Sequence, residues 1–274
     1  MSTQTALFSH PDADVTPDLT AYDVILINSS GGKDSQAMLD YVAELATAAD
    51  VTDRITVLHN PLGRVEWPGT SELAREQAEH YGVRYEERKR EKGDLLQQIE
   101  ERGMWPSAKA RYCTSDQKRG PGRRLITELV AELNLPKGRQ ARVLYALGLR
   151  AQESRGRAKL TPLMENSATS GVREVTTWHP ILHWTADQVW ARIHASGVRY
   201  HEAYDQGMQR LSCSFCVLAT AEDLVCAARL RPDLAAEYVA LEERMGHQFK
   251  ADLSMADVLA EAQRRARPTV GGGR

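Results

Sequence analysis

The 274-residue sequence has little of what marks secreted, membrane-bound or disordered proteins. It contains only four cysteines, and in the reducing compartment expected for this chain they argue against a disulfide framework. Its apolar runs, such as Val24–Ile27, are far shorter than the roughly 20 residues of a membrane-spanning helix. The first 20 residues lack the basic and apolar parts of a signal peptide. We therefore expect a cytoplasmic protein that does not bind membranes.

The composition is that of an ordinary globular protein, with 42% hydrophobic and 26% charged residues. The net charge of −2 hides an asymmetry: residues 102–159 hold 14 Lys and Arg against 4 Asp and Glu. The rest of the chain holds 21 basic against 33 acidic residues. Such a basic stretch suggests a site for a phosphate or polyanion, but solvated helix faces would explain it equally well.

Short apolar runs rich in β-branched residues alternate with helical patterns, which predicts a doubly wound α/β fold. We expect a mostly parallel, five-stranded sheet followed by a helical C-terminal region. The runs at 23–28, 55–59, 83–87 and 143–149 predict strands. Helices are expected at 36–49, 70–81 (capped by Thr70 or Ser71), 94–102, 115–133 (interrupted at Gly120-Pro121-Gly122) and 185–196, with two or three more within 221–267.

A glycine turn, Ser30-Gly31-Gly32-Lys33-Asp34-Ser35, lies between the first predicted strand and helix, where doubly wound sheets bind phosphate. Glycine lets the backbone approach a ligand closely, and the N–H groups at a helix start attract anions. Lys33 adds a positive charge. Asp34 can orient the loop or hold a magnesium ion, and Ser35 can cap the helix and donate to a phosphate oxygen. An ordinary Gly-Gly turn is the alternative interpretation.

The spacing of this turn matches neither the nucleoside-triphosphate P-loop nor the dinucleotide fingerprint. It resembles the pyrophosphate loop of the adenine nucleotide α-hydrolase superfamily. That resemblance implies that ATP and Mg²⁺ bind here and that ATP is split between its α and β phosphates. By this resemblance the nucleotide-binding residues of the turn are Ser29, Ser30, Gly31, Gly32, Lys33, Asp34 and Ser35.

Further segments resemble the phosphoadenylyl-sulfate reductase-like branch of that superfamily and follow its order over residues 23–220. They are Glu66-Trp67-Pro68-Gly69-Thr70, Tyr112-Cys113-Thr114 with Lys118 and Pro121, the stretch from Gly148 to Arg155, and Trp178-His179-Pro180-Ile181 with Trp184, Asp187, Val189 and Trp190.

The resemblance implies that Gly148, Arg150 and Arg155 contact nucleotide phosphates, and that Lys33, Asp34, Arg150 and Arg155 are catalytic. His59 ends the second predicted strand, so it can either touch the nucleotide or make a structural hydrogen bond. The three tryptophans of the last segment are most simply core residues.

Four cysteines are candidate metal ligands: Cys113, Cys213, Cys216 and Cys226. The Cys-x2-Cys turn with an upstream cysteine resembles the iron–sulfur members of the family and implies a [4Fe–4S] cluster. The sequence departs from those members, which have two adjacent cysteines upstream. Zinc on four thiolates and simple buried cysteines are the alternatives. Cys226 is the candidate for the fourth ligand. The alternative is an open iron, as in related tRNA-thiolating enzymes with three-cysteine clusters, since Cys226 also fits the core face of a helix.

The family's reductases use a further cysteine near the C-terminus, and here no cysteine follows Cys226. We therefore expect an ATP pyrophosphatase that activates an acceptor for sulfur insertion. The chain looks most like the ATP-pyrophosphatase component of bacterial DNA phosphorothioation systems. The alternatives are tRNA base thiolation, sulfonucleotide (APS/PAPS) reduction and a non-catalytic ATP-binding sensor subunit.

The same resemblance implies the partners. They are DNA, contacted by basic residues such as Lys118, Arg119, Arg123 and Arg124, a cysteine desulfurase, and a DNA-nicking or DNA-opening subunit. A homodimer is a further option. The expected domains are a flexible lead-in (1–20), the nucleotide-binding domain (21–184), a helical region with the Cys-x2-Cys turn (185–268) and a disordered tail (269–274).

Overall fold

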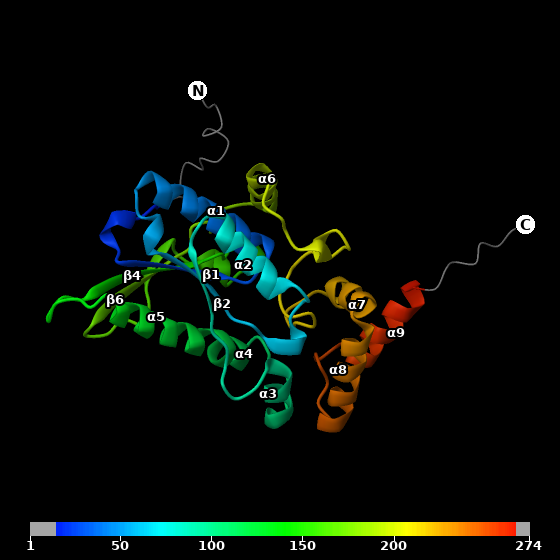
Figure 1. Ribbon diagram of the computed structural model, residues 1–274. Helices are drawn as coiled ribbons and strands as arrows, with labels where there is room; N and C mark the ends of the chain where they lie inside the picture. The colour runs from blue at the N-terminus through cyan, green and yellow to red at the C-terminus, as the bar shows by residue number, and fades with distance from the viewer. Residues whose placement is uncertain (1–14, 267–274) are drawn as a thin grey trace, which may run out of the picture. The chain divides into compact units, whose positions relative to one another are not determined.

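The computed structural model describes residues 15–266 (Figure 1). The predicted tail at 269–274, and residues 1–14 of the predicted lead-in, lie outside the described residues.

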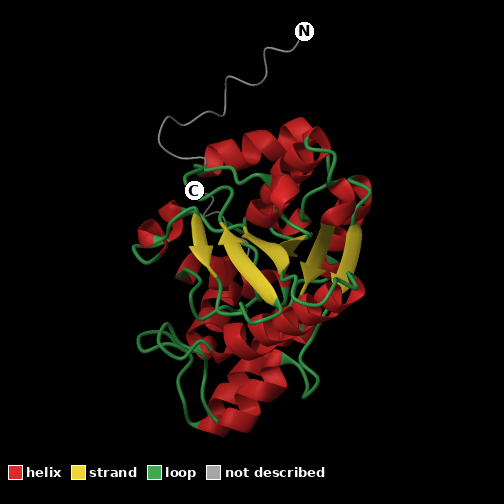
Figure 2. Cartoon of the chain, turned by 90° about the vertical axis from the view of Figure 1, so that its left-hand side faces the viewer, coloured by secondary structure: helices red, strands yellow, loops and turns green. Residues whose placement is uncertain are grey.

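The described chain contains one six-stranded sheet with helices on both of its faces (Figure 2), which confirms the expected α/β class. The strand order is β3-β2-β1-β4-β6-β5, and only β5 runs antiparallel to its neighbour. The strands are β1 (Val24–Ser29), β2 (Ile55–His59), β3 (Arg84–Glu87), β4 (Ala141–Leu147), β5 (Leu163–Glu165) and β6 (Arg173–Trp178).

The expected number of five strands is wrong by one. The pair β5 and β6 explains the difference, because β5 is only three residues long and β6 mixes charged and threonine residues with apolar ones. Neither strand has the continuous apolar run that identifies a buried strand from sequence. β6 is specified by its parallel pairing with β4, a contact between distant parts of the chain.

The helices largely follow the predicted ones. They are α1 (Lys33–Ala48), α2 (Thr70–His80), α3 (Leu95–Arg102), α4 (Tyr112–Thr114), α5 (Gly120–Glu132), α6 (Ala186–Ser196), α7 (Ala221–Leu230), α8 (Pro232–Met245) and α9 (Met255–Ala266). A π-helical turn, Ser115–Arg119, joins α4 to α5.

Two local predictions about helix ends are wrong. Gly120-Pro121-Gly122 does not interrupt the helical run: helical turns continue without a break from Tyr112 to Glu132, and the triplet directly follows the wider π-helical turn Ser115–Arg119. The cap of α2 is neither Thr70 nor Ser71 but Gly69, whose φ of 78° suits glycine and which offers no side chain to the helix N–H groups.

The chain divides into two compact units that interleave in sequence. Unit 1 comprises residues up to Asn60, Gly69–Arg88 and Gly120–His201, and unit 2 comprises Pro61–Pro68, Lys89–Arg119 and the residues from Glu202. The sequence patterns instead predict one boundary after residue 184. Unit 1 contains the whole sheet, and unit 2 contains α3, α4 and α7–α9.

In unit 1, β1 is buried on both sides, and its alternating side chains build two separate core clusters. Ile25 and Ile27 pack in a cluster with residues of α1, whereas Val24 and Leu26 pack in a cluster with residues of α5. The two helices therefore lie on opposite faces of the sheet (Figure 1). Buried Trp178 and Trp184 belong to the first cluster.

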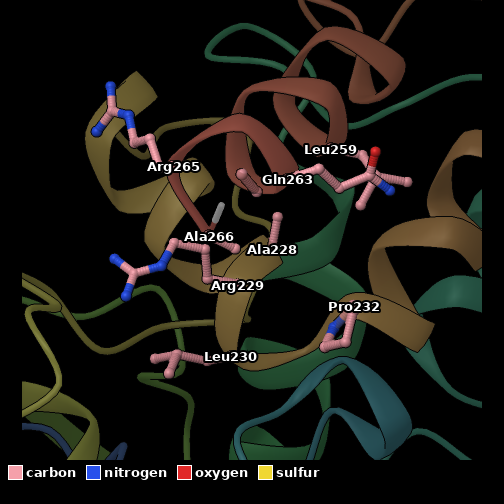
Figure 3. Close-up of a pocket in the computed structure, with 9 residues that line it drawn as sticks. Ala228, Arg229, Leu230, Pro232, Leu259, Gln263, Arg265 and Ala266 are labelled. Atoms are coloured by element: carbon pink, nitrogen blue, oxygen red, sulfur yellow. The ribbon is translucent and has the colours of Figure 1, made fainter. Parts of the chain in front are cut away.

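In unit 2, aromatic side chains form the centre of the core. Trp105 stacks on Tyr238 with ring centroids 5.2 Å apart, and Phe215 lies 5.0 Å from Tyr238. The helices α7, α8 and α9 also line a surface pocket of about 530 Å³ (Figure 3). Its lining is mostly hydrocarbon, together with Gln263 and the guanidinium groups of Arg229 and Arg265.

Within residues 15–266, no helix is both long and apolar enough to cross a lipid bilayer.

Thr185, which the sequence predicts as the first residue of a helix, is instead the N-cap residue of α6. This capping gives a test of the fold. Thr185 accepts from the N–H of Gln188 at 3.2 Å, and its own N–H donates to the Gln188 side chain at 2.7 Å. We expect Thr185→Ala to lower the free energy of unfolding by about 1 kcal/mol in urea denaturation, because the capping bonds are weakened. Thr47→Ala, at an exposed position inside α1, is the control and should change stability by less than about 0.5 kcal/mol. Equal effects of the two substitutions would contradict the capping box.

Candidate functional site

The glycine turn lies where the sequence places it, at the carboxyl end of β1 and the start of α1. Helix α1 begins at Lys33, with Gly32 as its cap residue. The Ser35 hydroxyl donates to the carbonyl of Gly32 at 2.8 Å and accepts from the N–H of Ser30 at 3.2 Å. The Ser35 side chain thus stabilises the backbone of the turn through two hydrogen bonds. The N–H groups of the first turn have no acceptor within the helix, so the turn presents donors that suit an anion.

A largely buried cluster of charges lies beside the turn. The Arg150 Nε donates to Asp34 Oδ1 at 2.6 Å, and Lys33 Nζ lies 3.6 Å from Asp34 Oδ2. Lys33 and Arg150 are both buried. Asp34 therefore holds two cations at the ends of β1 and β4, with both of its oxygens engaged. It is placed to orient the site, and its carboxylate is already occupied by protein partners.

Two glycines let these elements approach each other. Gly31 has a φ of +66°, and a Cβ there would stand 2.7 Å from the Thr70 Cγ2. A Cβ on Gly148 would stand 3.0 Å from the backbone oxygen of Asp34 and 3.2 Å from the Ser35 Cα. Gly148 follows β4 directly, so the missing side chain brings the end of that strand against the first turn of α1.

Arg150 is held in place by Glu153, which is absent from the predicted site residues. Glu153 accepts from the backbone N–H of Arg150 at 3.1 Å and also pairs with Arg157. Glu153 lies within the stretch from Gly148 to Arg155, which the sequence analysis used only to establish the resemblance. Arg155, the other arginine predicted to be catalytic, is exposed.

His59 lies at the end of β2 and is buried. Its Nδ1 is 3.0 Å from the carbonyl oxygen of Ser29 at the end of β1. This is the structural hydrogen bond that was one of the two interpretations of His59. Beyond it, the Asn28 amide donates to Asn60 at 3.2 Å, and the Asn60 amide donates to the carbonyl of Arg88 at 2.7 Å. These bonds link the ends of the strands in unit 1.

Three of the four cysteines come together in unit 2. Cys213 and Cys216 form a hydrogen-bonded pair, which together with burial raises the pKa of Cys213, and the same hydrogen bond lowers the pKa of Cys216 to about 5. Cys113, on α4, lies close enough to feel their charges, and burial raises its pKa. The positive charges of Lys118 and Arg210 favour thiolates here. The distant segments that the resemblance groups together are therefore neighbours.

Cys226 has different surroundings. Its thiol donates to the carbonyl of Gln206 at 3.4 Å, and burial raises its pKa. Among residues 15–266, no group of three or more His, Cys, Asp and Glu side chains is arranged to hold a metal ion. As placed, the thiols therefore do not fit a metal centre, and the [4Fe–4S] cluster and zinc both stay predictions.

The Cys-x2-Cys turn is fixed by a half-buried arginine that the sequence did not reveal. Arg231 donates to the Ser214 hydroxyl at 2.7 Å and to the backbone oxygens of Glu66 and Arg64 at 2.5 and 3.0 Å. The Ser214 N–H in turn donates to the carbonyl of Val65 at 2.8 Å. These bonds join residues 64–66 to the turn within unit 2.

The basic stretch at 102–159 is shared between the two units, and part of its charge is neutralised. Arginines of the stretch that make ion pairs with carboxylates include Arg102, Arg139, Arg142, Arg150 and Arg157. Part of the charge of this stretch is therefore neutralised by carboxylates of the protein itself.

Comparison with known proteins identifies the family. The model of the phosphoadenosine phosphosulfate reductase domain matches residues 24–219, and the chain belongs to this family. Membership places it among enzymes whose name-giving reaction acts on a sulfur-bearing nucleotide. The match begins at β1 and includes the glycine turn, Arg150 and the Cys-x2-Cys turn.

The individual relatives are distant. An uncharacterized 37.8 kDa protein of Escherichia phage 186 is 34% identical over 125 residues, which are 45% of this chain and 34% of that protein. The matches to curated relatives span only 28 to 47% of those proteins' lengths.

Among solved structures, the phosphoadenylyl-sulfate reductase of Candida auris is 19% identical, with a TM-score of 0.44, over 73% of this chain and 82% of that one. The U34-tRNA thiolase NcsA of Methanococcus maripaludis, solved with its [4Fe–4S] cluster, is 12% identical, with a TM-score of 0.43, over 91% of this chain and 74% of that one. Both likenesses are too remote to bear on function.

The close approach at Gly148 gives a test of the site. We expect Gly148→Ala to lower the free energy of unfolding by about 1–3 kcal/mol and to weaken ATP binding, because the added methyl group displaces the first turn of α1. Urea denaturation and calorimetric titration with ATP measure the two effects. Gly171→Ala is the matched control, since nothing lies within 4 Å of the added carbon. Equal ATP affinity of the two variants would contradict a role of the close approach at Gly148 in ATP binding.

Proposed function

We propose that this chain is an ATP pyrophosphatase that adenylates a nucleic-acid acceptor for sulfur insertion, and that the acceptor is a phosphate of the DNA backbone. The observation that carries the proposal is the charged cluster of Lys33, Asp34 and Arg150 beside the glycine turn. Family membership supports a nucleotide and a sulfur-related reaction. The choice of ATP and of DNA rests on the resemblance set out above.

The charges of the site suit a triphosphate. Two buried cations share one carboxylate, so the cluster keeps a net positive charge that a phosphate chain can neutralise. The N–H groups of the turn donate to phosphate oxygens without any rearrangement of side chains. Asp34 has both oxygens engaged and offers no free carboxylate to a cation. Magnesium, where present, takes its oxygen ligands chiefly from the nucleotide phosphates and water.

In the proposed reaction, Lys33 and Arg150 act through their positive charges. A non-bridging oxygen of the acceptor phosphate attacks the α phosphorus of ATP, and the bond between the α phosphorus and the β-bridging oxygen breaks. Pyrophosphate leaves with the electron pair. Lys33 and Arg150 stabilise the charge that develops on the phosphate oxygens. The product is an anhydride of AMP with the acceptor.

Sulfur insertion completes the reaction. The terminal sulfur of a protein persulfide attacks the activated acceptor phosphorus, and AMP leaves. A second thiol then attacks the remaining sulfur–sulfur bond, which yields a disulfide and leaves one sulfur atom on the acceptor. The thiols of Cys113, Cys213 and Cys216 are candidates for this second step, and no step is drawn through a metal.

The test measures pyrophosphate release from ATP by the full chain, with duplex DNA or tRNA added separately, together with a cysteine desulfurase and cysteine. We expect AMP and pyrophosphate in equal amounts with DNA, and phosphorothioate linkages in the nuclease digest by mass spectrometry. Lys33→Ala should lower the rate at least about 100-fold, since it removes a charge that stabilises the transition state. Lys159→Ala, at an exposed lysine of unit 1, should keep the wild-type rate.

Each alternative gives a different result. Thiolated tRNA with unmodified DNA would assign base thiolation, and sulfite release from a sulfonucleotide would assign a reductase. ATP binding without pyrophosphate release, with both acceptors present, would leave a sensor. Any of these outcomes contradicts the proposal.

A further inference from the structure

Arg123 and Arg173 of unit 1 lie together, and within residues 15–266 the bonds shown for them go to no carboxylate. Arg173, at the start of β6, donates from Nε to the carbonyl of Ala168 at 2.9 Å and from Nη1 to the Thr127 hydroxyl at 2.7 Å. Arg123, one turn before Thr127 on α5, donates to the hydroxyl of Ser167. All three acceptors are neutral oxygens, so both positive charges stay uncompensated by these bonds.

This arrangement differs from that of other arginines on the same unit. Arg84 pairs with Glu86 and Glu132, and Arg88 pairs with Glu86 and Glu128. Glu174, next to Arg173 in sequence, pairs with Arg142. Side chains of successive strand residues point to opposite faces, so this carboxylate belongs to the other face. The two guanidinium groups are near each other because they donate to the consecutive residues Ser167 and Ala168. Burial and the charge of Arg123 lower the pKa of Arg173.

The support for the two arginines is rigid. The Thr127 hydroxyl donates to the carbonyl of Arg123 at 3.0 Å while it accepts from Arg173. The loop that carries Ser167 and Ala168 is itself tied down, since Asn166 accepts from the Ala168 N–H at 2.9 Å and donates to the Thr177 hydroxyl at 2.8 Å. Two like charges held at a fixed spacing repel each other, and an anion that bridges them relieves the repulsion.

We propose that Arg123 and Arg173 form a binding site for phosphate groups of the DNA backbone, on the face of the sheet that α5 covers. The identity of this ligand rests on the proposed function, in which DNA is the acceptor. Guanidinium groups bind phosphate through paired N–H donors, and each arginine keeps N–H groups beyond those used in the bonds above. Only Arg123 belongs to the basic stretch at 102–159, so the site joins that stretch to a residue outside it.

The test is fluorescence anisotropy of labelled duplex DNA with the full chain, over a series of salt concentrations. We expect Arg123→Gln and Arg173→Gln each to weaken DNA binding about tenfold near 0.1 M salt, and each to reduce the slope of log Kd against log salt by about 1. Arg173→Lys should keep the slope, because it keeps the charge. Arg84→Gln is the control, since its guanidinium is already paired with two carboxylates, and it should bind DNA like the wild type.

The outcomes separate this site from the proposed function. Wild-type protein that releases pyrophosphate with DNA, together with a double Gln variant of unchanged affinity and slope, overturns the site alone. Wild-type protein that binds neither DNA nor tRNA overturns both. Binding of tRNA but not DNA, lost in the double variant, overturns DNA as the ligand. Thermal denaturation of each variant must show a folded protein, and Arg173→Lys supplies the folded comparison if Arg173→Gln does not fold.

Discussion

The largely buried ion pair between Asp34 and Arg150 is the interaction on which the candidate site depends. It joins residues 116 positions apart and connects the start of α1 with the segment after β4. Burying two charges is costly, and the loss of one partner of a buried pair typically costs about 3–5 kcal/mol. The pair therefore adds little to the stability of the fold, but it fixes the position of the segment after β4 relative to the start of α1. Gly148 lets the two segments approach, and Glu153 holds the backbone of Arg150.

The position of Asp34 also explains how the charge of the buried Lys33 is stabilised. An isolated buried ammonium group would lose its proton or move to solvent, because burial disfavours the charged form. Asp34 lies beside it and beside Arg150, so one carboxylate stabilises two cations next to the donors of the glycine turn. Two cations and one carboxylate thus stand together beside the N–H donors of the turn. In unit 2, by comparison, the cysteine turn is held by a half-buried arginine, Arg231, whose acceptors are neutral oxygens.

Local features were predictable from the sequence, and pairings between distant segments were not. The turn between β1 and α1 follows from a strand, two glycines and a helical pattern next to each other in the chain. The strand β5 has only three residues, and β6 depends on β4, so neither has a local signal. The Gly-Pro-Gly sequence predicts a break in the helix, but the structure continues the helical turns through it, directly after the π-helical turn Ser115–Arg119.

For the candidate site, the residues could be predicted from the sequence, but their hydrogen-bond and ion-pair partners could not. Arg150 was selected through resemblance, but its contact with Asp34 could not be derived from residues so far apart. The grouping of Cys113 with Cys213 and Cys216 likewise came from resemblance, and the three now lie within electrostatic reach. Cys226 has the helix-face signal of a core residue, and the contact shown for its thiol is with Gln206.

The most direct test of the central claim is the affinity for ATP of the Arg150→Gln variant, measured by calorimetry beside Arg199→Gln. Arg199 is an exposed arginine of unit 1 that pairs with Glu76. If the cluster is the triphosphate site, Arg150→Gln should lose at least about tenfold in affinity, the factor that 1.4 kcal/mol represents. Arg199→Gln should bind like the wild type. Equal affinity of all three proteins would contradict the account.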